Sequence, residues 1–234
     1  TAHLIHNANV PPENITALTF TNKAAREMKD RVEHIVRRPT EGWYLGTFHS
    51  IAARILRKHA ELVGLKTNFT ILDADDQSRL LKQILAARDI DEKRWPARSL
   101  GAIINRWKDR GLTPEQTEGE DPGDFAAGRA KELFYRYCQT LKAQNAADFG
   151  DLLLHCLTIF QEQPDVLSEH QRRFKYILVD EYQDTNHIQA SILEELAKPH
   201  QNLMVVGDDD QSIYSWRGAD FRNILEFPAQ NNAK

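Results

Sequence analysis

The stretch YILVDEYQDTN, residues 176–186, decides the fold class of this chain. It opens with apolar residues that do not alternate with polar ones, a pattern typical of a strand buried on both faces of a sheet. A second apolar run, LMVVGD at 203–208, follows the helical pattern HIQASILEELAK at 187–198. A strand, a helix and a strand in this order predict a parallel sheet that helices cover on both faces.

The N-terminal part of the chain repeats this alternation. The sequence predicts strands at 15–20 and 44–49, and amphipathic helices at 22–36 and 50–64. Thr21 carries a hydroxyl that can cap the first of these helices. The chain therefore has strand and helix units near both of its ends.

The residues between these two α/β segments have a different pattern. From about residue 75 to residue 173, the apolar periodicity is helical throughout. We therefore predict one parallel α/β domain formed by residues 1–54 and 151–234. An all-helical subdomain of residues 55–150 interrupts it.

The composition is that of a soluble globular protein, with 41% hydrophobic and 27% charged residues in a chain of 234. No apolar run approaches the roughly 20 residues that a membrane span needs, and the chain does not open with a signal-peptide pattern. Cys138 and Cys156 lie in segments with helical periodicity and have no neighbouring cluster of metal ligands. We interpret both as reduced thiols of a cytoplasmic protein.

The net charge of −4 argues mildly against a nucleic-acid binder, but the charge is unevenly distributed. Residues 20–60 contain nine Lys or Arg and four Asp or Glu. Such an excess can be only a solvated face, or it can bind phosphates while the whole chain stays acidic. The basic residues of this window are Lys23, Arg26, Lys29, Arg31, Arg37, Arg38, Arg54, Arg57 and Lys58.

Asp180 and Glu181 follow the buried strand at 176–179 directly. In a parallel α/β sheet, ligands bind outside the carboxyl ends of the strands. Two adjacent carboxylates at such an end fit nucleotide hydrolysis, in which the Asp holds Mg²⁺ and the Glu deprotonates the attacking water. The alternative is that both carboxylates cap the next helix, where negative charge is favourable.

The stretch VVGDDDQSIYSWRGAD, residues 205–220, follows the second buried strand and is expected at the same edge of the sheet. The Gln211 amide can both donate and accept, which suits a contact to a terminal phosphate or its attacking water. Tyr214 and Trp216 lie beside Arg217 in a polar stretch, where aromatic rings can stack bases for about 1–3 kcal/mol each. The alternative for Trp216 is an anchor in the core under the loop.

Four stretches together resemble successive motifs of the UvrD/Rep/PcrA family of superfamily 1 DNA helicases. They are ALTFTNKAAREMKDRV, GTFHSIAARIL, ILVDEYQDTNHIQ and VVGDDDQSIYSWRGAD. The resemblance covers essentially the whole chain, and it implies a RecA-like sheet of the P-loop NTPase type with a helical insertion. It further implies an ATP-dependent 3′-to-5′ DNA helicase and translocase that uses ATP and Mg²⁺.

The resemblance also implies roles for individual residues. Asp180 resembles the Mg²⁺-binding residue, Glu181 the water-activating residue, and Gln211 the residue that reports the γ-phosphate to the DNA site. DNA contacts are then expected from residues 20–60 and 214–217 at one edge of the sheet, with Trp216 stacking on a base. The residues implied to contact DNA are Phe20, Thr21, Asn22, Thr47, His49, Tyr214, Trp216 and Arg217.

The implied partners are single-stranded DNA and junctions of duplex with single strand. The resemblance does not choose between repair and replication, and it predicts no particular protein partner. The short helical insertion and the sequence DDDQSIYSWRGAD favour a UvrD-like protein over a second enzyme, the helicase subunit of a recombination nuclease complex.

The chain departs from the family in one motif. The phosphate-binding pattern G-x-x-x-x-G-K-[ST] does not occur in these residues. We expect the chain to be truncated at both ends, and we expect these residues alone to be inactive. A third hypothesis is a non-enzymatic module that binds single-stranded DNA or a protein and has no phosphate loop.

Overall fold

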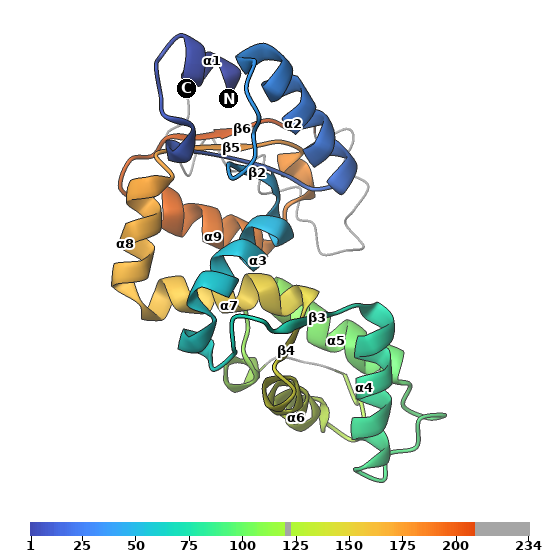
Figure 1. The fold of residues 1–234 in the computed structure, drawn as a ribbon. Coiled ribbons are helices and arrows are strands. Elements are labelled where there is room, and N and C mark those ends of the chain that lie inside the picture. The colour runs from blue at the N-terminus through green and yellow to red at the C-terminus, as the bar shows by residue number, and fades with distance from the viewer. Residues whose placement is uncertain (120–122, 209–234) are drawn as a thin grey trace. The chain divides into compact units, whose positions relative to one another are not determined.

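A computed structural model describes residues 1–119 and 123–208 of the chain (Figure 1). The chain divides into two compact units. Unit 1 consists of Thr1–Arg54 and Leu157–Lys234, and unit 2 consists of Ile55–Cys156. Both boundaries between the units fall inside helices, namely α3 (Phe48–His59) and α7 (Phe149–Glu162).

Unit 1 contains, within its described residues, a four-stranded sheet with the strand order β2-β1-β5-β6. Every neighbouring pair is parallel, which confirms the predicted sheet. Leu18 pairs with Val179 on one side of β5, and Val179 pairs with Val205 on its other side. The strands are β1 (Ile15–Thr19), β2 (Tyr44–Thr47), β5 (Tyr176–Val179) and β6 (Leu203–Val205).

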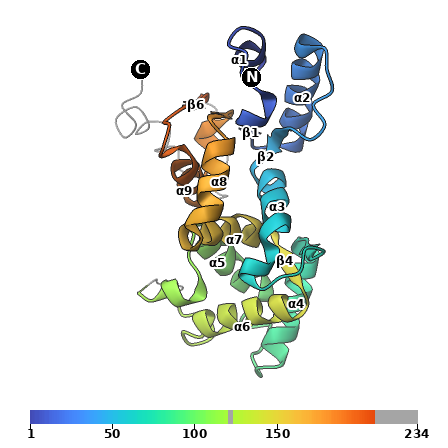
Figure 2. The ribbon, with the colours of Figure 1, turned by 60° about the vertical axis from the view of Figure 1, so that its left-hand side comes forward.

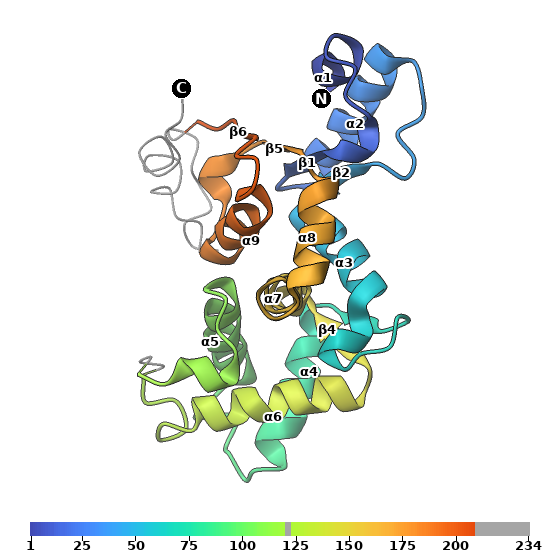
Figure 3. The same ribbon diagram turned by 90° about the vertical axis from the view of Figure 1, so that its left-hand side faces the viewer.

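Helices cover both faces of this sheet (Figures 1 and 3). The helices α1 (Ala2–His6) and α2 (Asn22–Val36) lie on one face, and α8 (Pro164–Arg173) and α9 (His187–Ala197) lie on the other. Every residue of β1 is buried, as expected for a strand covered on both faces. The core under α1 and α2 contains Ile5, Val10, Ile15, Ala17, Val32, Val36 and Leu45.

Local sequence signals set the ends of α2. The Thr21 hydroxyl accepts a hydrogen bond from the amide of Ala24 at 3.1 Å, which confirms its predicted role as N-cap. At the other end, Arg37 adopts the left-handed conformation with φ 55°, and its amide bonds the carbonyl of Glu33. Because α2 follows β1 and returns antiparallel to it, the first turn of α2 lies near the carboxyl end of the strand.

Unit 2 is mainly helical, and α4 packs against both α5 and α6 (Figure 2). It also contains two short parallel strands, β3 (Thr70–Leu72) and β4 (Ala146–Asp148). The expectation of an all-helical subdomain is corrected at this point, because strands of three residues are too short to produce a recognisable period. The helices wholly inside unit 2 are α4 (Ala74–Ala86), α5 (Ala97–Asp109) and α6 (Ala130–Ala143).

A buried ion cluster ties several elements of unit 2 together. The Lys108 ammonium, whose side chain is 0% exposed, lies 2.8 Å from Asp148 Oδ2 and 2.6 Å from Asp151 Oδ1. The Tyr137 hydroxyl donates to Asp148 Oδ2 at 2.8 Å. Burial lowers the pKa of Lys108, but the two carboxylates raise it by more, so the net pKa is above its ordinary value.

The described residues contain two 3₁₀ segments in unit 1, η1 (Pro12–Asn14) and η4 (Tyr182–Asp184), and two in unit 2, η2 (Ala60–Val63) and η3 (Pro114–Thr117). The segment η4 begins two residues after Asp180, where the chain turns from β5 towards α9. Among the described residues, every helix is too short or too polar to cross a lipid bilayer.

Candidate functional site

The carboxyl ends of the four strands in unit 1 lie along one edge of the sheet, here called the carboxyl edge, at Thr19, Thr47, Val179 and Val205. The amide of Asp180 donates to the carbonyl of Leu18 at 2.9 Å, and the amide of Val206 donates to the carbonyl of Val179 at 2.8 Å. The chain after β5 therefore leaves the sheet between the chains after β1 and β6.

Asp180 presents an exposed carboxylate at the carboxyl edge. Its Oδ1 accepts a hydrogen bond from the amide of Glu181 at 3.1 Å. Glu181 has φ 55° and ψ 42°, the left-handed conformation that few non-glycine residues adopt. Backbone conformations of this kind cluster at functional sites, where the surrounding structure holds them in place.

The buried side chain of Gln183 connects the turn after β5 with the chain after β6. Its Nε2 donates to Glu181 Oε2 at 2.6 Å, and its Oε1 accepts from the amide of Asp208 at 3.1 Å. The amide of Tyr182 also donates to the carbonyl of Val206 at 2.9 Å. Two hydrogen bonds therefore fix residues 206–208 beside the acidic turn.

Asp184 adds a further carboxylate near that of Glu181. The residue is 6% exposed, and its Oδ1 has no hydrogen-bond partner among the described residues. Burial raises the pKa of Asp184, and the nearby Glu181 carboxylate raises it further. Sequence reasoning did not single out Gln183 or Asp184, although both lie in the same DEYQDTN stretch as the acid pair.

The capping of α9 bears on the alternative role of the two acids. Asn186 and Gln189 form a reciprocal capping box, in which each side chain bonds the backbone amide of the other. The first turn of α9 contains no acidic residue. Asp180 and Glu181 are therefore not the caps of this helix, and their position at the carboxyl edge needs another explanation.

The residues after β1 are accessible at the same edge. Thr21 and Asn22 are exposed, and Phe20 is half-buried. Lys23 and Arg26, in the first turns of α2, are exposed as well. The structure thus brings three of the residues implied to contact DNA to the carboxyl edge, next to two cations.

The residues at the carboxyl end of β2 are less exposed to solvent than those after β1. Thr47 is buried, and its Oγ1 accepts from the amide of Ser50 at 3.2 Å, so its hydroxyl caps α3. A Cβ atom added to Gly46 would lie 2.5 Å from Ser50 Oγ, so this cap leaves little room for a side chain at 46. His49 is half-buried, and burial lowers its pKa below the ordinary value for histidine.

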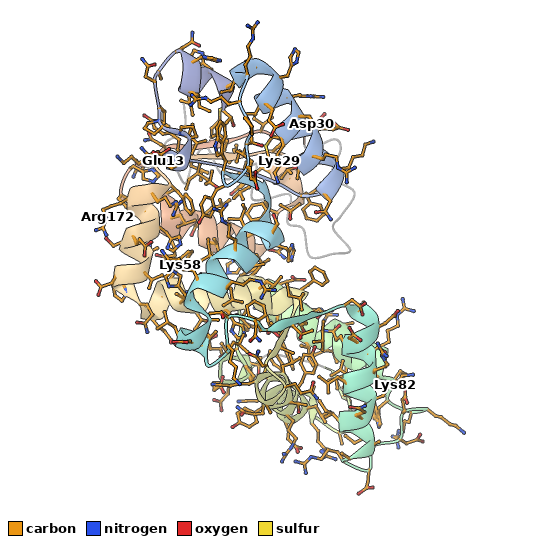
Figure 4. The ribbon with its side chains drawn as sticks, viewed as in Figure 1. Glu13, Lys29, Asp30, Lys58, Lys82 and Arg172 are labelled. Atoms are coloured by element: carbon orange, nitrogen blue, oxygen red, sulfur yellow. The ribbon has the colours of Figure 1, made fainter. Side chains whose placement is uncertain are left out.

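The basic window at 20–60 does not gather at one edge, which corrects that expectation. The Arg54 guanidinium donates to the carbonyls of Trp43 and Gly42 at 3.0 and 2.8 Å, and it lies 3.9 Å above the Tyr44 ring. These partners lie at the amino end of β2, away from the carboxyl edge. Lys29 and Asp30, labelled on α2 in Figure 4, are both exposed, and the basic residues of this helix alternate with acidic ones.

The last four implied site residues lie outside the described part of the chain. They are Gln211, Tyr214, Trp216 and Arg217, and the described chain after β6 ends at Asp208.

The sequence matches a known family over almost its whole length. Residues 1–232 match the family described as UvrD/REP helicase N-terminal domain. The chain belongs to the UvrD/Rep helicase family. This membership confirms the resemblance of the four sequence stretches, and the parallel sheet of unit 1 agrees with the α/β fold expected of such a domain.

Curated relatives within the UvrD/Rep family are substantially similar to the chain. It is 44% identical to the "ATP-dependent DNA helicase PcrA" of Staphylococcus epidermidis over 226 residues, which are 97% of this chain and 31% of that protein. It is 45% identical to the "Probable DNA helicase II homolog" of Rickettsia felis over 228 residues, which are 97% of this chain and 35% of that protein. The chain therefore spans about a third of the length of these relatives.

The residues of this UvrD/Rep domain fit the Mg²⁺ that the family implies. Within residues 1–119 and 123–208, no cluster of three or more His, Cys, Asp or Glu side chains could hold a metal ion alone. Mg²⁺ keeps several waters in proteins and is usually held by one or two carboxylates together with substrate phosphates. The exposed carboxylate of Asp180 at the carboxyl edge is a donor of the kind that such binding uses.

Proposed function

We propose that the full-length gene product is an ATP-dependent 3′-to-5′ DNA helicase and translocase, and that the carboxyl edge of unit 1 provides part of its nucleotide site. The observation that carries this proposal is the acid pair Asp180 and Glu181, which leaves the sheet beside the chain after β6. The names of the relatives and the match to a helicase domain support it.

Asp180 would hold Mg²⁺, either directly or through a water molecule. Its carboxylate is exposed, and its Oδ1 already accepts from the backbone, which orients the group at the strand end. Mg²⁺ bound there with ATP would neutralise charge that develops on the phosphate oxygens. The role of Asp180 is to fix where this positive charge lies.

Glu181 would orient the attacking water and accept its proton. The left-handed backbone at Glu181 turns the chain sharply after Asp180, so the two adjacent side chains need not point the same way. The hydrogen bond from Gln183 occupies Glu181 Oε2. Oε1 can then accept the proton of the water.

Gln211 would contact the γ-phosphate and report its presence to the DNA site. Only two residues separate it from Asp208, whose amide is bonded to Gln183. Tyr214, Trp216 and Arg217 would contact single-stranded DNA, with the Trp216 ring stacked on a base. A short segment would then join phosphate sensing to DNA binding, so that hydrolysis changes how a base is held.

The strand ends at β1 and β2 would extend the DNA track. Phe20, Thr21 and Asn22 would contact a base and the backbone, and Thr47 and His49 would form a second contact set. Lys23 and Arg26 add positive charge next to the first set, where phosphate contacts release counterions. Single-stranded DNA and its junctions with duplex are the proposed substrates, and the cytoplasm is the proposed location.

The 234 residues by themselves are proposed to be inactive, because they contain no Gly-rich loop ending in Gly-Lys-Ser or Gly-Lys-Thr. Such a loop supplies backbone amides and a lysine to the phosphates. Isothermal titration of ATP with Mg²⁺ into this chain should therefore detect no strong binding. A submicromolar dissociation constant would contradict this prediction.

The test of the proposed function is ATP hydrolysis by the full-length gene product, with and without single-stranded DNA. We expect hydrolysis that depends on Mg²⁺ and that single-stranded DNA stimulates, together with unwinding of a duplex that has a 3′ single-stranded tail. Single-stranded DNA binding without any hydrolysis would contradict the proposal and favour the non-enzymatic module. Hydrolysis that DNA does not affect would contradict the proposed coupling.

A further inference from the structure

We infer that Gln183 is a positioning residue, which holds the Glu181 carboxylate in place and links it to the chain after β6. The inference rests on the proposed function, because it assumes that Glu181 activates water. Gln183 itself would touch neither the nucleotide nor the water. Its effect would come through the two hydrogen bonds that its side-chain amide makes.

The geometry of Gln183 supports this role. The residue is 0% exposed, so neither end of its amide can exchange its partner freely for water. The Nε2 to Glu181 Oε2 distance of 2.6 Å is that of a short, charge-assisted hydrogen bond. The partner of Oε1 is a backbone amide, at Asp208, which stays the same whatever side chain stands at 208.

Glutamine suits position 183 better than the chemically similar residues glutamate and asparagine. One end of the side chain must donate to a carboxylate, while the other must accept from an amide, and a neutral amide does both. A glutamate would place a negative charge against Glu181 unless it were protonated. An asparagine is one methylene shorter and could not keep both contacts.

The link that Gln183 makes between Glu181 and Asp208 would couple the nucleotide site to the chain after β6. Asp208 begins the segment that leads to Gln211 and Trp216. A shift of this segment moves the acceptor end of the Gln183 amide, and the donor end then moves the Glu181 carboxylate. Nucleotide-site geometry would therefore follow the position of the chain after β6, with Gln183 as the link.

The test compares variants of the full-length gene product in steady-state ATP hydrolysis, with and without saturating single-stranded DNA. Gln183→Met removes both hydrogen bonds and fills nearly the same volume. We expect it to lower kcat by about 10–100-fold, as loss of a residue that orients a catalytic group typically does. The KM for ATP should change little, because Gln183 does not contact the nucleotide.

A matched control is Gln189→Met. Gln189 is also buried in the same region, but among the described residues its side-chain amide bonds only the backbone of Asn186 in the α9 cap. This variant should lose some thermal stability and keep its kcat. An equal loss of kcat in both variants would overturn the inference, because it would show a general effect of disturbing this region.

The second variant, Gln183→Glu, tests the hydrogen bond from residue 183 to Glu181 directly. A protonated glutamate can donate to Glu181 and accept from Asp208, whereas an ionised one repels Glu181. Burial and the like charge both raise the pKa of such a group above its ordinary value of about 4.3. The ratio of variant to wild-type kcat should therefore rise as the pH is lowered from about 8 to about 6.

The outcomes separate the two proposals. A wild-type protein without DNA-stimulated hydrolysis overturns the proposed function and the inference together. An active wild type, with a Gln183→Met protein that melts normally and keeps kcat within about twofold, overturns the inference alone. A ratio for Gln183→Glu that does not change with pH also overturns it, and this variant answers the question if Gln183→Met does not fold.

Discussion

At the scale of single residues, the acid pair after β5, Asp180 and Glu181, is the main part of the proposed nucleotide site. Asp180 and Glu181 are adjacent in sequence but differ in conformation, because only Glu181 adopts the left-handed backbone. Asp180 is exposed and Glu181 is half-buried, with one carboxylate oxygen bonded to Gln183. The two carboxylates can therefore perform different tasks.

Glu181→Gln should lower kcat for ATP hydrolysis in the full-length gene product by about 10²–10⁴-fold, the usual contribution of a general base. The amide cannot accept the proton of the water, but it keeps the shape of the site. Nucleotide should therefore stay bound, which equilibrium binding of a fluorescent ATP analogue can measure.

The control for this variant is Glu195→Gln, on α9, where the carboxylate pairs with the Lys198 ammonium at 2.6 Å. It should leave hydrolysis unchanged. Normal turnover by Glu181→Gln would show that another residue activates the water.

Trp216→Ala should weaken binding of single-stranded DNA by about 1–3 kcal/mol, the contribution of one stacked base. Trp43→Ala is the matched control, since Trp43 lies at the amino end of β2, away from the carboxyl edge. Fluorescence anisotropy with a labelled oligonucleotide measures both. Equal affinities of Trp216→Ala and wild type would favour the alternative that Trp216 is a core anchor.

The sequence predicted the acid pair but not how its neighbours hold it. Asp180 and Glu181 stand out because charge follows a buried apolar run directly. Gln183 and Asp184 do not stand out, since their burial depends on the sharp turn at Glu181 and on the pairing of β5 with β6. Neither feature has a local signature in the chain.

At the scale of elements, the buried ion cluster of unit 2 determines how α5, α6 and β4 are joined. Lys108 comes from α5, Tyr137 from α6, and Asp148 from the end of β4. Two carboxylates face one ammonium, and burial and Asp148 raise the pKa of Asp151. The cluster is stable only while each charge keeps its partner.

Lys108→Met should lower the free energy of unfolding of unit 2 by about 3–5 kcal/mol, because it leaves two buried carboxylates without a counter-charge. Urea denaturation followed by circular dichroism measures this change. Lys131→Met is the matched control, since Lys131 is exposed on α6. A loss no larger than that of the control would show that the cluster does not support unit 2.

Gly150→Ala is a second probe of the same cluster. In a helix, alanine is ordinarily favoured over glycine by roughly 0.5–1 kcal/mol. Gly150 lies in α7, and a Cβ added to it would lie 2.9 Å from Cδ of the buried Lys108 side chain. We expect a net destabilisation of about 1–3 kcal/mol in the same urea experiment. An increase in stability would show that Lys108 has room to move.

Strands and helices were predictable where a pattern runs for several residues. The apolar runs at β1 and β5 and the N-cap at Thr21 predicted their elements closely. The strands β3 and β4 were missed, since three residues carry no period. The basic window was interpreted as one strip, whereas α2 spreads its charges along its length and Arg54 of α3 bonds carbonyls at the amino end of β2.

At the scale of the whole molecule, the chain combines a parallel α/β unit with a mainly helical unit. Unit 1 contains the sheet whose carboxyl edge carries the acid pair, and unit 2 is made of residues 55–156, which the chain inserts between the two segments of unit 1. The family match extends over both units. The strands before this insertion, β1 and β2, and those after it, β5 and β6, thus form one sheet.

The central claim is that the acid pair and the Trp216 segment work at the same edge of unit 1. The most direct test is a structure of the full-length gene product bound to Mg²⁺, a non-hydrolysable ATP analogue and single-stranded DNA. The account predicts Mg²⁺ at about 2.1 Å from Asp180, or one water away, and the Trp216 ring stacked on a base along the same edge. Mg²⁺ remote from Asp180, or Trp216 at the opposite edge of the sheet, would contradict it.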